Sequence, residues 1–396
     1  MESSTGDRVR TARKLAGLTQ RELADASGLA LITVKKIEQD AYGSMRLETA
    51  RRLAVVLGVT VTRLTTEPDA PVPGPDSILR WEPVRRAIEG TARAAQPEQE
   101  PTLAGVQSAF SAIRPLLPTG RFAELGAVLP GLLRDADALV AISPDGAQVR
   151  ARTLRSHVRQ VAGALMLHTW QFAAADQAFA LALEDASVNA LKAASVIDER
   201  CWGLIRQGRL TEARELATGW ADRIEPRMSA AGEQLAAWGR LLIRASAAAI
   251  RDNRPGEADE ALRGARMAAA GTGEDFVLPH SPWHVFGPIS VAVAEAENAM
   301  IRDRPLEVLS IAARIRSAEI AIPRGAPAHR LDVADALVAL RQYPEAVTVL
   351  RQMQQDRPQW LAQQRHAADI VQKIIDKRRT PTQEMLDLAA AVGLPL

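Results

Sequence analysis

Side chains able to bind nucleic acid gather near the N-terminus of this chain. Thr33, Lys35 and Lys36 lie within four consecutive positions inside the segment LITVKKIE. A lysine ammonium can donate hydrogen bonds to guanine O6 and N7, and a threonine hydroxyl can bond to several bases. These groups can recognise a base only if a helix or strand holds them against the edge of that base. The surrounding sequence shows whether such a helix or strand is predicted.

Two short helices are predicted around these residues. Thr19 stands three positions before Glu22, which is the capping-box arrangement of a helix start. Gly28 breaks the first helix after about two turns, because glycine tolerates a left-handed backbone. The second helix is expected from about residue 30 to residue 39. Two short helices joined by a tight glycine turn form a helix-turn-helix, and its second helix can enter the major groove of DNA.

This stretch resembles the DNA-binding domain of the phage lambda repressor/Cro (XRE) family. The resemblance extends over about residues 7 to 66 and implies a domain of five helices. The residues that carry it are Thr19-Gln20, Glu22-Leu23-Ala24, Gly28, Val34 and Ile37-Glu38, with Val9, Leu15 and Leu18 upstream and Leu47, Ala50, Leu53, Ala54 and Leu57 downstream. The short last helix is expected in the segment GVTVTRL. The alternative is a helical hairpin with no role in nucleic-acid binding.

The resemblance also implies which residues face the bases. The expected positions on the second helix are Leu31, Ile32 and Lys36, flanked by Thr33 and Lys35. The family often has polar residues at the first two of these positions. Leu31 and Ile32 therefore either pack on thymine methyl groups or make a dimer or core contact.

Phosphate contacts are expected from further residues. Gln20 opens the helix before the second, or recognition, helix, where free N–H groups and the helix dipole favour an anion. The candidate phosphate partners, each with a solvated surface charge as the alternative, are Arg10, Arg13, Lys14, Arg21 and Arg46. The family usually turns with a glycine just after the recognition helix. Here Gln39-Asp40 stand in its place, so a loop of different shape is expected.

Composition favours a helical protein with its basic excess at the N-terminus. Of the 396 residues 47% are apolar and only 4% aromatic, which favours helices packed through small side chains. Residues 1–66 carry a net charge of +4 and the remainder −2, so the basic excess lies where DNA is expected. No apolar signal segment and no run of about 18 apolar residues occurs, so we expect a cytoplasmic protein without membrane contact.

The chain divides into three parts. Residues 7–66 form the expected DNA-binding domain, and residues 67–77 form an extended linker because EPDAPVPGPD holds four prolines. Residues 78–396 consist of amphipathic helices separated by short breaks. No segment alternates apolar and polar residues between turns, so no sheet is predicted and the expected fold class is all-α.

The helices of the third part recur in pairs. Five segments share one spacing of small and large apolar residues, and they begin at Phe172, Leu210, Pro255, Pro305 and Tyr343. Their small positions, at 175, 213, 258, 308 and 346, are 38 to 50 residues apart. The pattern resembles the second helix of a tetratricopeptide repeat, whose usual period is 34 residues. We therefore expect a degenerate tetratricopeptide-like α-solenoid, with an irregular helical array as the alternative.

A ligand-binding surface is expected on the inner face of this array. Projecting the repeat onto the first helix of each pair selects His157, Gln160, Asp198, Trp202, Arg240 and Glu297. A loop at 271–288, rich in glycine and proline, adds Trp283 and His284. Two alternatives stay open: the helix phase is off by one residue, or the loop plugs the core of the array instead of touching a ligand.

Catalysis is not expected. The six histidines are scattered without metal-ligand spacing, and the lone cysteine, Cys201, lies mid-helix with no marked base beside it. No glycine-rich phosphate loop follows a strand. We therefore expect no enzyme activity, no cofactor and no metal.

The layout resembles the peptide-pheromone receptors of Gram-positive bacteria, and WHVFGP resembles a segment of actinobacterial XRE-plus-repeat regulators. The resemblance implies a homodimer that binds double-stranded operator DNA under the control of a small-molecule or peptide effector. Substitution of Trp202 or Arg240 is expected to abolish the effector response and to leave DNA binding intact. The rival hypothesis is a DNA-tethered scaffold whose repeats bind a partner protein.

Overall fold

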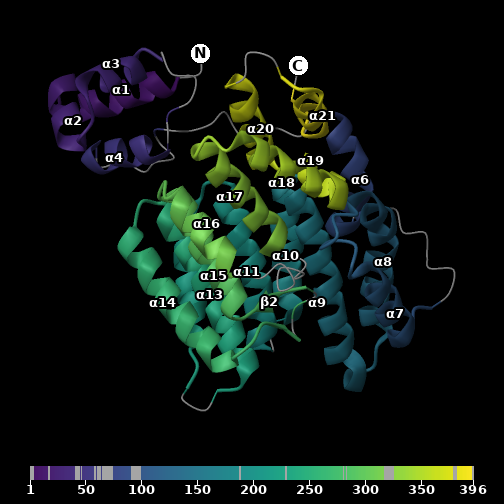
Figure 1. The fold of residues 1–396 in the computed structure, drawn as a ribbon. Coiled ribbons are helices and arrows are strands. Elements are labelled where there is room, and N and C mark those ends of the chain that lie inside the picture. The colour runs from purple at the N-terminus through teal and green to yellow at the C-terminus, as the bar shows by residue number, and fades with distance from the viewer. Residues whose placement is uncertain are drawn as a thin grey trace.

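The computed structural model is almost entirely helical (Figure 1). It describes residues 4–16, 18–40, 45, 47–57, 59, 64, 75–90, 100–186, 189–227, 230–279, 281, 283–315, 325–377 and 381–394. The expected all-α fold class is confirmed. Within these residues, none of the helices is both long and apolar enough to cross a membrane.

Within the described residues, the N-terminal unit holds four helices: α1 (Thr5–Leu15), α2 (Gln20–Ser27), α3 (Leu31–Glu38) and α4 (Leu47–Leu57). The predicted capping box is present, because the Thr19 hydroxyl accepts from the Glu22 N–H at 3.2 Å and the Glu22 carboxylate accepts from the Thr19 N–H at 2.7 Å. Gly28 ends α2 with a left-handed φ of 65°. Both signals of the helix-turn-helix are therefore confirmed.

The N-terminal unit has its own hydrophobic core. Val9, Leu23, Val34, Leu53 and Leu64 are completely buried in it, and no residue of this cluster belongs to the described cores of the remaining helices. Most of the expected fifth helix lies outside the described residues, as do residues 65–74.

The remaining helices are α6 (Pro75–Glu89), α7 (Leu103–Ile113), α8 (Phe122–Ile142), α9 (Asp145–His168), α10 (Phe172–Ala186), α11 (Ala190–Arg206), α12 (Leu210–Arg223), α13 (Gly232–Arg251), α14 (Pro255–Thr272), α15 (Pro288–Ile301), α16 (Pro305–Arg314), α17 (Gly325–Ala339), α18 (Tyr343–Asp356), α19 (Pro358–Ala362), α20 (Arg365–Asp376) and α21 (Gln383–Ala391). The first of them begins at Pro75, inside the segment expected to be linker. Proline is tolerated there because the first turn of a helix does not use its N–H groups.

The predicted repeats are confirmed as antiparallel helix pairs. Helices α10, α12, α14, α16 and α18 each begin at the residue expected from the sequence. Their small positions are buried, at 2% exposure for Ala175 and 0% for Ala213, Ala258, Val308 and Ala346. Each second helix can therefore approach its first helix closely.

One turn recurs between the two helices of each pair. Its middle residue has a left-handed backbone, at Trp170, Gly208, Asn253, Asp303 and Arg341. The next N–H then donates to the carbonyl five residues earlier, as from Gln171 to Met166 at 2.8 Å and from Arg254 to Ala249 at 2.9 Å. This is the Schellman bond that terminates a helix.

Among the described residues a sixth such turn lies at the break Pro118-Thr119-Gly120, which the sequence indicates as a break but not as part of a repeated pair. Gly120 has a φ of 76°, and the Arg121 N–H donates to the Leu116 carbonyl before α8 begins at Phe122. In α8 the position that is small in the other second helices carries Leu125, so the small residue that identified the other pairs is absent.

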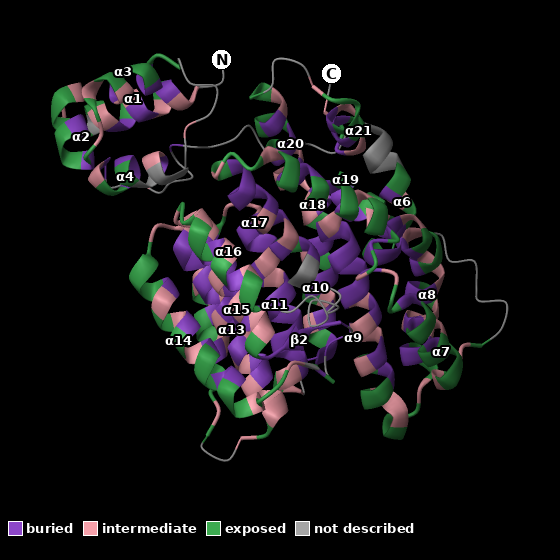
Figure 2. Cartoon of the chain, in the orientation of Figure 1, coloured by how far each residue is buried: buried purple, intermediate pink, exposed green. Residues whose placement is uncertain are grey.

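First helices of successive pairs contact one another, from α9 through α11, α13 and α15 to α17 and α20, and form the inner layer of the array. Figure 2 shows their buried residues at the centre of the molecule and exposed residues on the second helix α14.

The two ends of the array meet, unlike those of an open solenoid. The Trp170 indole N–H donates to the Gln363 carbonyl at 3.2 Å, and Arg357 donates to the Pro118 carbonyl. One hydrophobic cluster joins residues of α6–α11 to residues of α17–α21. In Figure 1, α19 lies beside the early helices.

The prediction that no sheet is present is wrong at one place. Strands β1 (Phe276–Val277) and β2 (Val285–Phe286) pair antiparallel, with Phe276 opposite Phe286. Helix α14 continues through Thr272, so the predicted structureless loop is shorter than expected. We call residues 273–287 the strap. Two-residue strands are too short to show the alternation by which a strand is predicted.

Candidate nucleic-acid interface and candidate effector site

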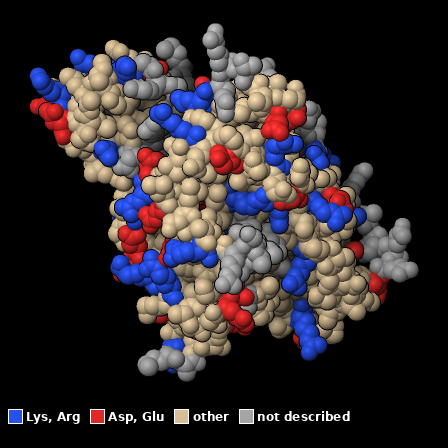
Figure 3. All heavy atoms as spheres, viewed as in Figure 1, with Lys and Arg blue, Asp and Glu red and all other residues tan. Residues whose placement is uncertain are grey.

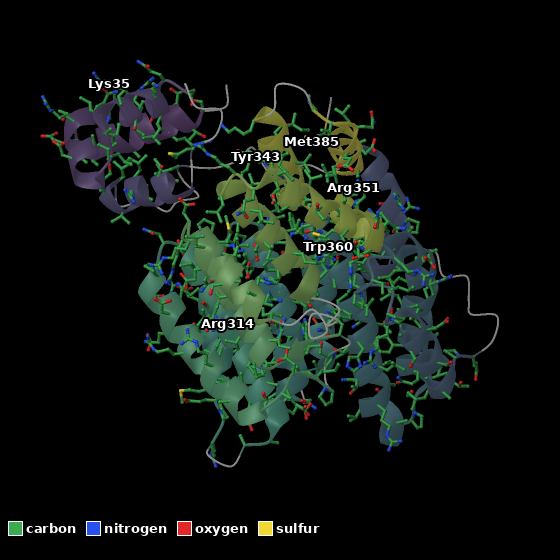
Figure 4. All side chains as sticks on the ribbon, in the orientation of Figure 1. Lys35, Arg314, Tyr343, Arg351, Trp360 and Met385 are labelled. Carbon is green, nitrogen blue, oxygen red and sulfur yellow. The ribbon has the colours of Figure 1, made fainter. Side chains whose placement is uncertain are left out.

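The recognition helix α3 has one buried and one exposed side. Val34 and Ile37 are 0% and 4% exposed, whereas Ile32 is 59% exposed. Lys35 and Lys36 are exposed as well, and Figure 4 shows Lys35 at the outer edge of the N-terminal helices. In Figure 3, lysine and arginine side chains stand on the outward surface of this unit. A basic side with one large aliphatic side chain therefore faces solvent.

The other expected base-facing residues are less exposed. Leu31 is half-buried and packs against the core of the unit, and Thr33 is half-buried. Among the phosphate candidates, Arg21 is exposed on α2, while Arg46 lies outside the described residues.

A buried carboxylate fixes α3 to the two preceding helices. Glu38 is 1% exposed and accepts from Arg13 at 2.6 and 2.9 Å and from the Gln20 amide at 2.8 Å. Burial alone raises the pKa of Glu38, but these hydrogen bonds and the arginine charges outweigh it and lower the pKa. Gln20 thus uses its amide to orient α3, a role that the sequence analysis did not assign.

The turn after α3 is closed by Asp40. Its carboxylate accepts from the Gly6 N–H at 2.8 Å and from the Ser4 hydroxyl at the start of α1. Asp40 has a φ of 51°, a left-handed conformation that aspartate adopts more readily than most residues. It therefore takes the place of the glycine that the family usually has.

The centre of the array holds a closed ionic cluster. Asp198 on α11 is 2% exposed and accepts from Arg240 at 2.7 Å and from Arg244 at 2.9 Å, both on α13. Burial raises the pKa of this carboxyl, but the two arginine charges outweigh it and hold the pKa well below its usual range. Arg244 also lies 5.1 Å from the ring centre of Trp202, which is one helical turn after Asp198.

The strap docks onto this ionic cluster. Glu199 accepts from the Trp283 indole N–H at 3.0 Å, and its Oε1 lies 2.5 Å from Nε2 of His284. The same ring nitrogen lies 3.1 Å from the Asp198 carboxylate. Burial is the largest influence on His284 and lowers its pKa to about 4, so the ring is neutral near pH 7.

Donor atoms of Asp198, Glu199 and His284 lie within 4.8 Å of one another, a spacing that could hold a metal ion. Two guanidinium groups, both paired with Asp198, already balance the charge of the two carboxylates. A divalent cation would add positive charge beside them and displace the hydrogen bonds of the strap. The arrangement therefore fits a structural ion network better than a metal site.

A second group of charges continues along the inner layer and retains access to solvent. Glu297 on α15 pairs with Arg251 on α13 at 2.5 Å, and each side chain is 25% exposed. On α17, Asp335 pairs with His366 and with Lys373 of α20, whose side chains are 42% and 52% exposed. Burial, followed by the charge of Glu297, raises the pKa of Asp332 to about 8.

His157 and Gln160 lie apart from these charges. The His157 ring stacks on Phe110 of α7 with centroids 5.5 Å apart. Gln160 is completely buried, where its amide donates to the Ser195 hydroxyl at 2.9 Å and its oxygen accepts from Lys192 at 2.6 Å. Burial lowers the pKa of Lys192 well below its ordinary value. These side chains connect α9 to its neighbours.

The family model described as helix-turn-helix matches residues 9–64 of this chain. Residues 9–64 are a helix-turn-helix domain. The matched segment runs from the buried Val9 of α1 to the buried Leu64, and so covers the whole N-terminal core.

No curated protein matches the chain. Among solved structures, it is similar to Bacillus thuringiensis PlcR in complex with the peptide PapR7 and DNA, at 13% identity and a TM-score of 0.28 over 69% of this chain and 96% of that one. It is also similar to the apo form of ComR from S. thermophilus, at 14% identity and a TM-score of 0.29 over 81% and 97%. TM-scores this low transfer no property of either protein.

Outside the helix-turn-helix domain, the expected ligand residues fall into three groups. Asp198, Trp202, Arg240, Trp283 and His284 meet in the ionic cluster. Glu297 belongs to the second, more exposed group of charges. His157 and Gln160 of α9 make separate contacts with neighbouring helices. Sequence reasoning missed Glu199 and Arg244, although Glu199 adjoins Asp198 and Arg244 follows Arg240 by one helical turn.

Proposed function

We propose that this protein is a sequence-specific transcriptional regulator that binds double-stranded operator DNA through α3. The carrying observation is the exposed side of that helix, with Lys35 and Lys36 on it, in a matched helix-turn-helix domain. The Glu38 network supports the proposal because it fixes the helix against α1 and α2. A recognition helix must be rigidly supported to read base edges in a groove.

The proposal includes a homodimer. One helix-turn-helix domain covers a single short half-site, and useful affinity normally comes from two domains spaced about one helical turn of DNA apart. Residues 7–66 would contact DNA, a linker would follow and end where α6 begins at Pro75, and the remaining helices would pair two copies. Molar mass by light scattering, with and without a selected duplex, tests this part.

Operator binding would respond to a small-molecule or peptide effector at the inner layer of the array. The support is the line of charges on α11, α13, α15, α17 and α20, several of which stay partly exposed although they are paired. A charged effector could exchange partners with such pairs at modest cost, because their charges are already desolvated in part. No enzymatic role is part of the proposal.

Thermal shift of the full-length protein against metabolite and peptide fractions tests the effector, followed by duplex binding with each fraction that shifts it. Trp202→Leu removes the ring that stacks on Arg244, and Arg240→Lys keeps a charge near Asp198, so that the buried carboxylate stays paired. Both variants should lose most of the response while binding DNA normally. Trp220→Leu is the matched control, because Trp220 stacks on Arg223 of the second helix α12.

Normal responses in both variants would overturn the assignment of the effector to this layer. If no fraction shifts the melting temperature and a partner protein co-purifies instead, the repeats serve as a scaffold and the effector is absent.

A further inference from the structure

Ile32 is unlike the other large aliphatic residues of α3. Its side chain is 59% exposed, whereas Val34 is 0% and Ile37 4% exposed, and Leu31 packs in part against the domain core. A helix in water gains stability by burying its aliphatic side chains, so an isoleucine left outside is suited to a contact that the isolated chain lacks.

The position of Ile32 restricts what that contact can be. It is the second residue of α3, at the end of a recognition helix that reaches base edges. The exposed lysines 35 and 36 follow it on the same short helix. An apolar protein surface would strip water from both ammonium groups without offering them partners, whereas DNA supplies phosphate and guanine acceptors beside an apolar group.

The major groove presents one apolar feature, the C5-methyl group of a pyrimidine, which thymine carries. Isoleucine has no hydrogen-bonding group and can distinguish bases only through such a contact. We propose that Ile32 reads a pyrimidine C5-methyl group in each operator half-site. This inference rests on the proposed function and adds the chemical feature that α3 selects.

The test starts from a random-sequence duplex pool made with thymidine and compares thymidine with deoxyuridine, which lacks the methyl group. Full-length protein selects duplexes from this pool at about 0.15 M salt. One selected duplex is then resynthesised with single deoxyuridine replacements. A further arm places cytosine or 5-methylcytosine at the sensitive position, which separates the two sources of the methyl group.

Wild-type protein should lose about fourfold in affinity at one position per half-site, which is the loss expected for one methyl group removed from contact. Ile32→Ala should bind the thymidine and deoxyuridine duplexes with nearly equal affinity at that position. Val55→Ala is the matched control, because Val55 is 65% exposed in the same domain but lies on α4, and it should keep the full effect.

The inference would be wrong if deoxyuridine weakened wild-type binding at no position, or if its effect were undiminished in Ile32→Ala. It would also be wrong if Ile32→Ala had a lower molar mass than wild type, because Ile32 would then contact a second copy of the chain. Failure of the thymidine pool to yield any preferred duplex would instead reject the proposed function, and this inference with it. Circular dichroism melts of Ile32→Ala should match wild type, because the residue is mostly exposed.

Discussion

Single residues in both parts of this protein show how buried charges fix geometry. Glu38 joins three helices of the helix-turn-helix domain, and Asp198 joins α11 to two arginines of α13 and to the strap. Removing one partner of such a group leaves a desolvated charge, which costs more than the pair itself contributes. These residues position other side chains, and the groups offered to ligands lie beside them.

Substitution of Lys36 tests whether α3 contacts base edges directly. Lys36→Ala should weaken binding to a selected duplex by about 1–3 kcal/mol and relax base preference at one position, because an ammonium that donates to guanine is lost. Fluorescence anisotropy on a panel of single-base variants measures both quantities. Lys14→Ala, an exposed lysine of α1, is the control. Equal losses on every sequence would show that Lys36 contacts only phosphate.

The raised pKa of Asp332 predicts that the stability of the protein depends on pH. The folded pKa of this residue, raised to about 8 by burial and by the charge of Glu297, exceeds the value in the unfolded chain. The folded protein therefore retains a proton that the unfolded chain has released, so stability is lost as pH rises towards 8, by up to about 1.4 kcal/mol per pH unit. His284, with its pKa lowered to about 4, acts with the opposite sign only below its unfolded value of 6.5.

Urea melts between pH 6.5 and 8 measure the Asp332 contribution. Asp332→Asn should flatten the slope in this window, since the amide does not titrate. Partial burial lowers the pKa of His366, but its hydrogen bond to Asp335 outweighs this and raises the pKa, so His366 contributes with the same sign and is unchanged in the variant. Asp356→Asn is the control, because the pKa of that carboxyl is lowered and it stays charged throughout. An unchanged slope in Asp332→Asn would contradict the raised pKa.

At the scale of elements, the recurrent turn organises the array. Four of its left-handed positions carry residues other than glycine, which cost roughly 1 kcal/mol each in that conformation. Arg341 is exposed, so Arg341→Gly should raise the free energy of unfolding by about 1 kcal/mol, and Gly208→Ala should lower it by a similar amount. Denaturant melts would contradict this if Arg341→Gly proved neutral or destabilising.

The strap depends on one glycine of α13. A Cβ atom added at Gly239 would lie 2.1 Å from Cζ of the Phe286 ring, so Gly239→Ala should displace the strap and cost about 1–3 kcal/mol. Hydrogen–deuterium exchange should accelerate across residues 276–286. Gly219→Ala on α12 is the control, because its new methyl would meet nothing within 4 Å. Unaltered exchange in Gly239→Ala would show that Phe286 does not hold the strap.

The elements could be predicted where the pattern that specifies them lies within a short stretch of sequence. The starts of α10 and α14 follow from local spacing of small and large residues, and the capping box at Thr19 is equally local. The meeting of the array's two ends rests on contacts between residues more than 190 positions apart, such as Trp170 with Gln363, which no local pattern encodes. Projecting the repeat onto the first helix of each pair found Asp198 and Arg240, which meet in the ionic cluster. The same projection also selected Gln160, which lies outside that cluster.

At the scale of the whole molecule, the helix-turn-helix core is separate from the cores of the closed array. Because the ends of the array meet, its inner layer is bounded on more sides than that of an open solenoid. An effector that changes the pairing of charges on α13, α15 and α17 would therefore act on one connected body. Such a body could alter how two DNA-binding domains are spaced.

The most direct test of the central claim is binding of the purified full-length protein to fragmented genomic DNA of its source at about 0.15 M salt, with and without cell extract, followed by sequencing of the bound fragments. The account predicts strong enrichment of a few promoter fragments that share a two-fold motif, and its loss in Lys36→Ala. Uniform recovery of all fragments under both conditions would contradict it.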